Sequence, residues 1–148
     1  MNHRDRMQAC ISGSAVDRPP VALWRHFPID DQDPSTLARS LIHFQQTYDF
    51  DFVKITPASS YCLLDYGVTD EWRGNPEGTR DYTCRPIKGP GDWLKLPRIS
   101  PTEGNLAETL EAIRQVRAVV ESHTPVIQTI FDPMSQAKKL PGNDTLLA

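Results

Sequence analysis

The chain has 148 residues, of which 39% are hydrophobic and 24% are charged, and its formal net charge at pH 7 is -3. These values predict a soluble globular protein with one core, forming a single domain over residues 1–148. Because there is no basic surplus, they exclude the electrostatic footprint of a nucleic-acid or anionic-membrane binder, so the expected partner is a small molecule.

The first predicted elements are a short helix and a buried strand. Apolar residues recur at helical spacing through HRDRMQACISG, between Asn2, which is placed to cap the helix, and Gly13, which is placed to end it. After the turn-like segment 17–20, the apolar run VALW at residues 21–24 has the length and the bounds of a buried strand.

A second helix and a second strand follow. Asp33 and Pro34 form a helix start, because Asp accepts from free backbone N–H groups and Pro lacks only a donor that would be unsatisfied anyway. An apolar stripe then predicts a helix to about residue 48, at Leu37, Leu41, Phe44 and Tyr48. Residues 50–56 are rich in β-branched and aromatic side chains, which predicts the second strand.

Residues 65–97 interrupt this alternation. Glycines divide the stretch into short pieces, and it is too long for an ordinary βα loop of about 2–6 residues. Loops of this size usually carry small elements of their own. We expect an inserted hairpin and a short helical turn around Trp93.

The alternation resumes with a third helix, for which Asn105 is the predicted cap and Glu108 its capping-box partner. Residues 126–131 predict a third strand, and Asp132 and Pro133 repeat the earlier helix start. Strands that alternate with helices predict the α/β class with parallel strands in one sheet. No glycine-rich phosphate loop of the common nucleotide-binding types occurs, which favours a barrel over an open sheet.

The cysteine spacing and the short apolar runs indicate the cellular compartment in which the protein is expected. Cys10, Cys62 and Cys84 are odd in number and lack the C-x-x-C spacing of zinc or dithiol sites, which favours a reduced protein. The charged N-terminal segment lacks a secretory apolar run, and no stretch approaches the roughly 18 apolar residues of a membrane span. A cytoplasmic protein without a membrane partner is therefore expected.

Two segments resemble signatures of the uroporphyrinogen decarboxylase family. Residues 125–137, PVIQTIFDPMSQA, are similar to its third-strand signature, in which a P-[LV]-I-G-F strand leads into a P-W-T-L-A helix start. Residues 18–25, RPPVALWR, are similar to its first-strand R-x-P-V-W-x-M-R. The wider superfamily includes cobamide-dependent methyltransferases built on the same barrel.

This resemblance implies a TIM (β/α)8 barrel, of which the chain would hold only the N-terminal three or so βα units. It also implies a carboxy-lyase of porphyrin biosynthesis that decarboxylates a tetrapyrrole, or another small carboxylate substrate, without a cofactor. Ile29 replaces a basic residue of the family pattern, and Lys54 stands where the family has its pyrrole-binding aspartate. A methyltransferase of the same barrel family, with zinc ligands in a C-terminal half, is therefore an alternative. So is an inactive truncated remnant or interaction module.

Three residues are predicted to be catalytic. Arg25 follows the first predicted strand, at the rim where barrel enzymes gather their catalytic residues. Arg25 and Lys54 would bind and neutralise substrate carboxylates, and His26 would donate a proton or orient the substrate. The structural alternatives are a surface arginine, an ion-paired lysine at the strand rim and a packed histidine.

Further substrate-binding candidates are Tyr61 and Asp65, in the loop after the second predicted strand, and Gln128 on the third. Gln128 could equally face the helix layer. No metal site or cofactor-binding residue is predicted.

A (β/α)8 barrel needs about 250 residues, whereas three strand–helix units are visible here. An open three-stranded sheet would leave unpaired edges. We therefore expect a truncated product, or one part of a split barrel whose open sheet edge is covered by a partner chain or by a second copy.

Overall fold

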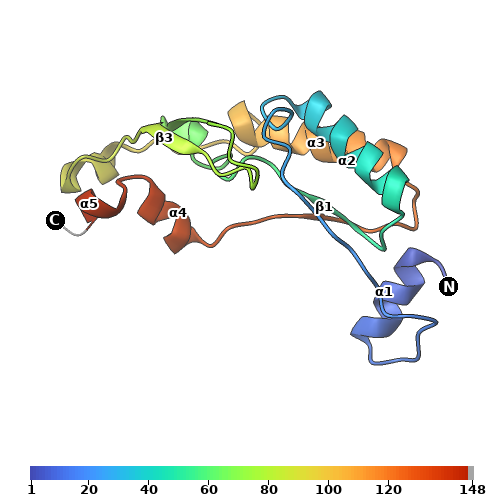
Figure 1. Cartoon of the computed structure of the whole chain (residues 1–148). Coiled ribbons are helices and arrows are strands. Elements are labelled where there is room, and N and C mark those ends of the chain that lie inside the picture. Colours follow the sequence, from blue (N-terminus) through green and yellow to red (C-terminus); the bar gives the residue numbers. More distant parts are fainter. Residues whose placement is uncertain (147–148) are drawn as a thin grey trace. The chain divides into compact units, whose positions relative to one another are not determined.

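The computed structural model describes residues 1–146 of the chain (Figure 1), and the last two residues of the predicted 1–148 domain lie outside them. The chain divides into two compact units. The first comprises Met1–Pro57 and Glu111–Thr129, and the second comprises Ala58–Leu110 and Ile130–Ala148. Each unit holds its own cluster of buried apolar side chains, whereas the composition predicted a single core.

Two strands of the first unit pair in parallel, as the alternation predicted. β1 (Val53–Ile55) lies beside β4 (Val126–Gln128), with Lys54 opposite Ile127 in the register. Both strands lie inside the predicted ranges 50–56 and 126–131 but are shorter. The protein therefore has a mixed α/β fold, and the described residues form no closed barrel.

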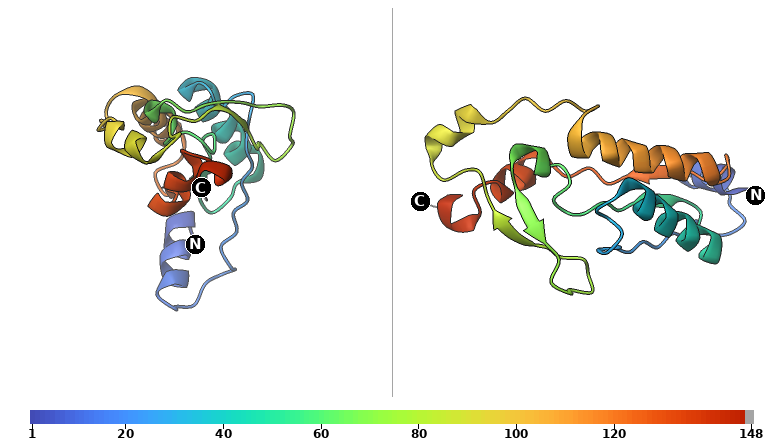
Figure 2. Two further views of the ribbon diagram at one scale, coloured as in Figure 1. Left: turned by 90° about the vertical axis from the view of Figure 1, so that its left-hand side faces the viewer. Right: turned by 90° about the horizontal axis from the view of Figure 1, so that it is seen from above.

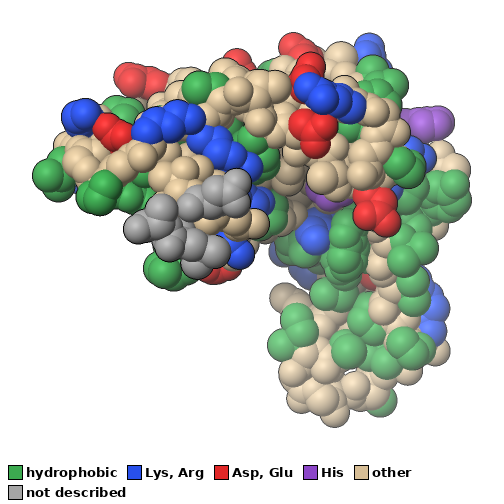
Figure 3. Space-filling model, turned by 60° about the vertical axis from the view of Figure 1, so that its left-hand side comes forward, with side chains coloured by type: hydrophobic (Ala, Val, Ile, Leu, Met, Phe, Trp, Pro, Cys, Tyr) green, Lys and Arg blue, Asp and Glu red, His purple; other side chains and the backbone are tan. Residues whose placement is uncertain are grey.

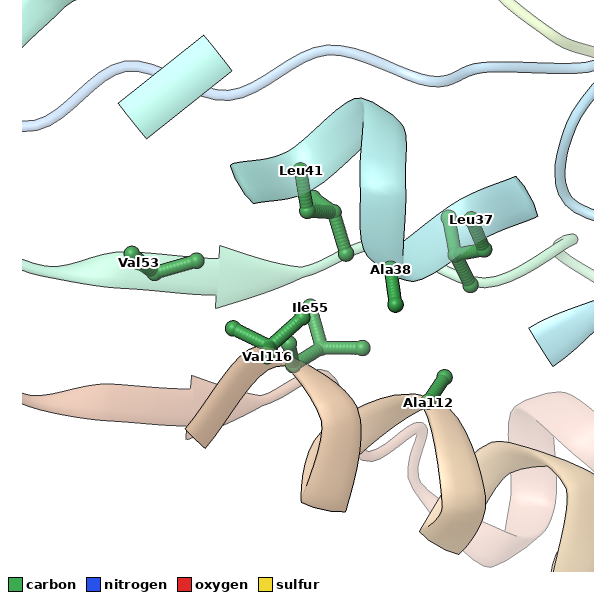
Figure 4. Packing of buried hydrophobic residues seen from close by; sticks show 7 residues of the cluster. All are labelled: Leu37, Ala38, Leu41, Val53, Ile55, Ala112 and Val116. Carbon is green, nitrogen blue, oxygen red and sulfur yellow. The ribbon is translucent and has the colours of Figure 1, made fainter. Parts of the chain in front are cut away.

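Two helices pack on one face of this sheet. α2 (Pro34–Tyr48) and α3 (Gly104–Val119) lie side by side in Figure 2. Between them and β1 is a core of fully buried side chains, drawn in Figure 4: Leu37, Ala38, Leu41, Val53, Ile55, Ala112 and Val116. Burying such side chains stabilises a fold by about 1.5–3 kcal/mol for each large one.

The predicted start of α2 is confirmed. The Asp33 side chain accepts hydrogen bonds from Ser35 N and Thr36 N, both at 2.9 Å, and Pro34 occupies the first turn. The helix ends at Tyr48, and the capping residue Asp49 has a φ of 50°, in the left-handed region. The predicted stripe is buried at its N-terminal half, but Tyr48 is 59% exposed.

α1 (His3–Ile11) begins as predicted, because the Asn2 side chain accepts a hydrogen bond from Asp5 N at 2.8 Å. Its apolar residues are not the buried ones, however. Ile11 is 81% exposed, whereas His3 and Arg6 are buried. Polar contacts rather than apolar packing therefore hold this helix, which the hydrophobic spacing did not indicate.

The carboxylate of Asp51 joins α1 to the start of β1. Arg6 Nη1 and Arg18 Nη1 each donate to it at 2.5 Å, and Val21 N donates at 2.6 Å. Asp51 is fully buried, so these donors replace the water that it loses on folding. Desolvation acts to raise the pKa of Asp51, but the hydrogen bonds from Arg18, Val21 and Arg6 outweigh it and hold that pKa below its usual value.

A second polar contact joins α1 to the start of β4. His3 Nδ1 and Thr124 Oγ1 lie 2.8 Å apart and are buried, and Arg117 donates to the carbonyl of Thr124 at 2.7 Å. Asp51 and Thr124 each precede a strand of the parallel pair. α1 therefore lies at the N-terminal end of the sheet, away from the end where barrel enzymes hold their active sites.

The predicted strand at residues 21–24 is wrong. The segment is extended, but its backbone polar groups bind side chains around β1 rather than another strand. Val21 N donates to the Asp51 carboxylate, and just after the segment the carbonyl of Arg25 accepts from Thr56 Oγ1 at 2.9 Å. Among the described residues, one backbone hydrogen bond, from Asp51 N to Val21 O, joins this segment to the residues before β1. Leu23 and Trp24 stay at least half exposed, so burial does not support a strand there.

The second unit contains the interrupted stretch. β2 (Thr69–Glu71) and β3 (Asp81–Cys84) form an antiparallel hairpin, and two 3-10 helices, η1 (Leu64–Tyr66) and η2 (Pro90–Lys95), flank it. α4 (Pro133–Lys139) and α5 (Asn143–Leu146) complete the unit. The predicted start of α4 is confirmed, because the Asp132 side chain accepts from Ser135 N at 2.8 Å.

The predicted cap of α3 is wrong. The helix starts at Gly104, two residues before the Leu106 start that an Asn105 cap implies, and the Asp65 carboxylate accepts from Asn105 N at 3.0 Å and from Leu106 N at 3.3 Å. The cap is thus a carboxylate some 40 residues away in the chain, and Asn105 Nδ2 also donates to it at 2.6 Å. A distant carboxylate performs the role that local spacing assigned to Asn105 and Glu108.

Among the described helices, none has both the length and the apolar character to cross a membrane.

Candidate functional site

Lys54 lies on the sheet face that the helices leave uncovered. Its neighbours Val53 and Ile55 are buried in the core, and successive side chains of a strand point to opposite faces. Its ammonium lies 4.0 Å from the ring centroid of Trp24, in a cation–π contact, and this contact takes the place of the ion pair that was the structural alternative for Lys54. Ile127, its partner in the register, is 44% exposed on the same face.

Arg25 and His26 lie near the residues that follow β1, because Thr56 Oγ1 donates to the carbonyl of Arg25 at 2.9 Å. Arg25 is exposed, and its guanidinium carbon is 5.3 Å from the ring centroid of Phe27. The Nδ1 atom of His26 is buried and has no hydrogen-bond partner among the described residues. Arg25, His26 and Lys54 therefore belong to the same unit, near the C-terminal end of β1.

Gln128 points away from them. It pairs with Ile55 in the register, so its side chain shares the helix-covered face of the sheet. Gln128 Nε2 donates to the carbonyl of Thr129 at 2.9 Å, and its Oε1 is buried without a partner among the described residues. The helix-facing alternative is the one that fits this placement.

Asp65 is taken up by the cap of α3, where both of its oxygens accept backbone N–H groups. This contact gives Asp65 a structural role that the loop position alone did not reveal.

The second unit contains a groove with an aromatic lining, which we call the aromatic groove. Its walls come from the chain that follows β1, from η2 and from the chain that follows β4, and they include Tyr61, Cys62, Tyr66, Trp93, Phe131 and Gln136. The rings of Tyr61 and Phe131 lie 6.0 Å apart between centroids. Of the predicted site residues, Tyr61 lines this groove.

One polar pair lies in the aromatic groove. Cys62 Sγ donates to Gln136 Oε1 at 3.1 Å, and Gln136 Nε2 is buried without a partner among the described residues. Burial raises the pKa of the Cys62 thiol, although the charge of Lys139 acts in the opposite direction. The groove thus offers a neutral thiol and an unused amide donor.

Neither Cys62 nor Gln136 was predicted from the sequence as a site residue. Each follows a strand of the parallel pair. This position could have indicated them as site residues, because the functional groups of barrel enzymes gather after strands. Their hydrogen bond could not be predicted, because the two residues are 74 positions apart in the sequence.

The raised pKa of Cys62 predicts the order in which the three free cysteines react. Cys10 and Cys84 are exposed, whereas Cys62 is partly buried and stays protonated at neutral pH. Because the thiolate is the reactive form, we expect iodoacetamide at pH 7.5 to label Cys62 roughly tenfold more slowly than the other two. Peptide mass spectrometry over a time course measures this order, and equal rates would contradict the burial of Cys62.

No three His, Cys, Asp or Glu side chains within the described residues lie close enough to hold a metal ion together. Within the aromatic groove, the polar groups available to a ligand are instead the amide of Gln136 and the thiol of Cys62. A bound molecule would be held by hydrogen bonds and aromatic contact.

No protein-family model and no curated protein matches the sequence, so the resemblance to uroporphyrinogen decarboxylases gains no support from them. Among solved structures, the chain is similar in fold to a methyltransferase from Methanosarcina mazei, with a TM-score of 0.74 and 18% sequence identity. The similarity covers 99% of this chain and 47% of that chain. The chain thus spans about half the length of the methyltransferase that it matches.

Proposed function

We propose that this chain forms part of a barrel-type methyltransferase and that its aromatic groove binds the molecule that carries the methyl group. The fold likeness to a methyltransferase over 99% of the chain is the observation that carries the proposal. The groove supports it, because its walls follow β1 and β4, the position at which barrel enzymes hold their substrates.

The chemistry of the groove also favours methyl transfer over decarboxylation. Removing carboxyl groups from a tetrapyrrole requires cations that neutralise several carboxylates, and Ile29 stands where the decarboxylase pattern has one of them. The groove instead has mostly aromatic and apolar walls with the protonated thiol of Cys62. Such walls suit an uncharged methyl group and a flat ring system.

A cobamide is the methyl carrier that the related barrel family suggests. It would supply the transferable methyl group, and it has a flat ring system with peripheral amide groups. Tyr61, Trp93 and Phe131 could pack against such a ring, and the unpartnered Nε2 of Gln136 could donate to one of its amide oxygens. The donor set for zinc is not found among the described residues, so no step through a metal is assigned to this chain.

The complete reaction needs more walls than these units provide. β4 pairs with β1 alone among the described strands, which leaves its outer edge available for another strand. We place the remaining barrel strands at this edge, from a partner chain, a second copy or a longer polypeptide.

Binding of methylcobalamin tests the proposal. We expect the chain to bind methylcobalamin, and Tyr61→Leu to weaken this binding about 3–10-fold, because an aromatic contact contributes about 0.5–1.5 kcal/mol. Titration calorimetry measures the affinity. Tyr48→Leu is the matched control, because Tyr48 is exposed on α2 in the first unit and should leave the affinity unchanged.

Two results would overturn the proposal. One is the absence of methylcobalamin binding by a folded chain, and the other is equal affinity of both variants. Uroporphyrinogen is the comparison ligand. If the chain binds uroporphyrinogen tightly and does not bind methylcobalamin, the result would favour a decarboxylase over a methyltransferase.

A further inference from the structure

A second cavity of the second unit is basic. Its lining contains three cations, Arg85, Lys138 and Lys139, together with Ser135, Gly142 and Asn143. None of these six residues is acidic, although the whole chain has a net charge of -3. Figure 3 shows several Lys and Arg side chains close together on one face of the molecule. We call this second cavity the basic cavity.

Arg85 is held in place from three sides. Its guanidinium carbon lies 4.2 Å from the ring centroid of Tyr82, and its Nη1 donates to the carbonyl of Lys139 at the end of α4. The third side is Gly142, where an added Cβ would lie 3.1 Å from Cδ and Nε of Arg85. A guanidinium has five N–H donors, so one bond to Lys139 leaves donors for a ligand.

Lys139 connects the basic cavity to the aromatic groove. It lines the cavity, and its ammonium lies 5.0 Å from the ring centroid of Phe131, which lines the groove. A molecule with an apolar body in the groove and an anionic tail in the cavity would meet both surfaces.

We propose that the basic cavity binds the anionic group, a phosphate or a carboxylate, of the ligand whose apolar part occupies the aromatic groove. The inference rests on the proposed function and names the chemical class of its ligand. Arg85 supplies a positioned fork of donors, which matches the geometry of these oxyanions, and the two lysines add charge. Asn143 provides a neutral amide at the same cavity, whereas the Ser135 hydroxyl already donates to the Asp132 carboxylate.

Three small probes test the pairing of the two surfaces by titration calorimetry on the whole chain. They are inorganic phosphate, phenyl phosphate and benzoate. We expect phenyl phosphate to bind at least fivefold more tightly than inorganic phosphate, because only the former has a ring for the groove. The ratio of phenyl phosphate to benzoate affinity then distinguishes a phosphate ligand from a carboxylate ligand.

Charge variants test the residues. Lys139→Gln and Arg85→Gln should each weaken phenyl phosphate binding at least fivefold. Lys95→Gln removes the same charge from η2, where Lys95 pairs with Asp92 at 2.8 Å, and should leave binding unchanged. Equal affinities of Lys139→Gln and Lys95→Gln would overturn the proposal, as would a chain that binds neither phenyl phosphate nor benzoate.

Gly142→Ala separates geometry from charge. It keeps every cation, but its Cβ would displace Arg85, so phenyl phosphate binding should still fall. Gly74→Ala is the matched control, because Gly74 has a similar φ of 86° against 83° and nothing within 4 Å of an added Cβ. Thermal melting of each variant verifies that it is folded, and unchanged binding in folded Gly142→Ala would contradict the role of Arg85.

These measurements use no methyl donor, so the two proposals fail separately. Binding of methylcobalamin without binding of phenyl phosphate would overturn the anion site alone. Binding of phenyl phosphate without methylcobalamin would overturn the proposed function and leave the anion site standing.

Discussion

Asp51→Asn is expected to lower the free energy of unfolding of the first unit by about 3 kcal/mol, towards the lower end of the range for breaking a buried ion pair. Asp51 is fully buried and accepts from Arg6, Arg18 and Val21 N. Asparagine keeps the size of the side chain but removes the charge that both guanidinium groups require. We expect a loss near the lower end of that range because the side chain of Arg18 is 46% exposed, so its guanidinium can be solvated by water in the variant.

Urea unfolding monitored by circular dichroism measures this loss. Asp49→Asn is the matched control, because it makes the same chemical change two residues away at a side chain that is 82% exposed, and its contact with His3 Nε2 at 3.5 Å is one that an asparagine oxygen can also accept. Asn also tolerates the left-handed backbone of position 49, so this variant should lose less than about 0.5 kcal/mol. Equal losses in the two variants would show that the buried network does not hold α1 to the sheet.

The pH dependence of the Asp51 effect follows from its pKa. The pKa of Asp51 is lower in the folded chain than in the unfolded chain. Between these two pKa values the folded state therefore binds fewer protons than the unfolded state. The stabilisation is therefore present above the unfolded value of about 3.9 and is lost as the pH falls through the lower folded value. The stability difference between the natural chain and Asp51→Asn should persist at pH 7 and narrow below about pH 4.

Gly104→Ala is expected to destabilise the second unit, and this is the second of the two large losses of stability that we predict. Gly104 has a φ of 57°, in the left-handed region, where a side chain costs about 1–2 kcal/mol. An added Cβ would also lie 2.4 Å from Asp65 Oδ1, so the carboxylate that caps α3 must move away. Loss of such a cap costs a further 0.5–2 kcal/mol or so.

Hydrogen exchange at the first turn of α3 distinguishes the two contributions. Gly74→Ala carries the left-handed strain without the clash, so it should destabilise without exposing the N–H groups of Asn105 and Leu106. Asp65→Ala should expose those N–H groups without backbone strain. If Gly104→Ala leaves their exchange unchanged, then Asp65 is not the cap.

Local sequence chemistry was sufficient for several elements. The Asp-Pro pairs at residues 33–34 and 132–133 start α2 and α4, because an N-cap involves side chains and N–H groups only two or three residues apart. The β-branched run before Pro57 contains β1, and the interrupted stretch 65–97 contains a hairpin. Each of these structures is determined within one short segment.

The candidate site was harder to predict from the sequence. Tyr61 was expected on the substrate rim and lines the aromatic groove, but Cys62 and Gln136 were not identified. The basic residues of the basic cavity were also missed, because Arg85 and Lys139 are 54 residues apart in the chain. No periodicity or motif connects such distant positions.

The sequence by itself determined the alternation of helices and strands from α2 onward, and hence the parallel pair of β1 and β4 in a mixed α/β fold. Only the tertiary structure decided which polar groups meet. It placed Asp65 at the start of α3, buried Asp51 between two arginines and left residues 21–24 without strand pairing. The physical reason is that turns and caps satisfy nearby backbone groups, whereas a buried charge is satisfied by whichever donors the folded chain brings to it.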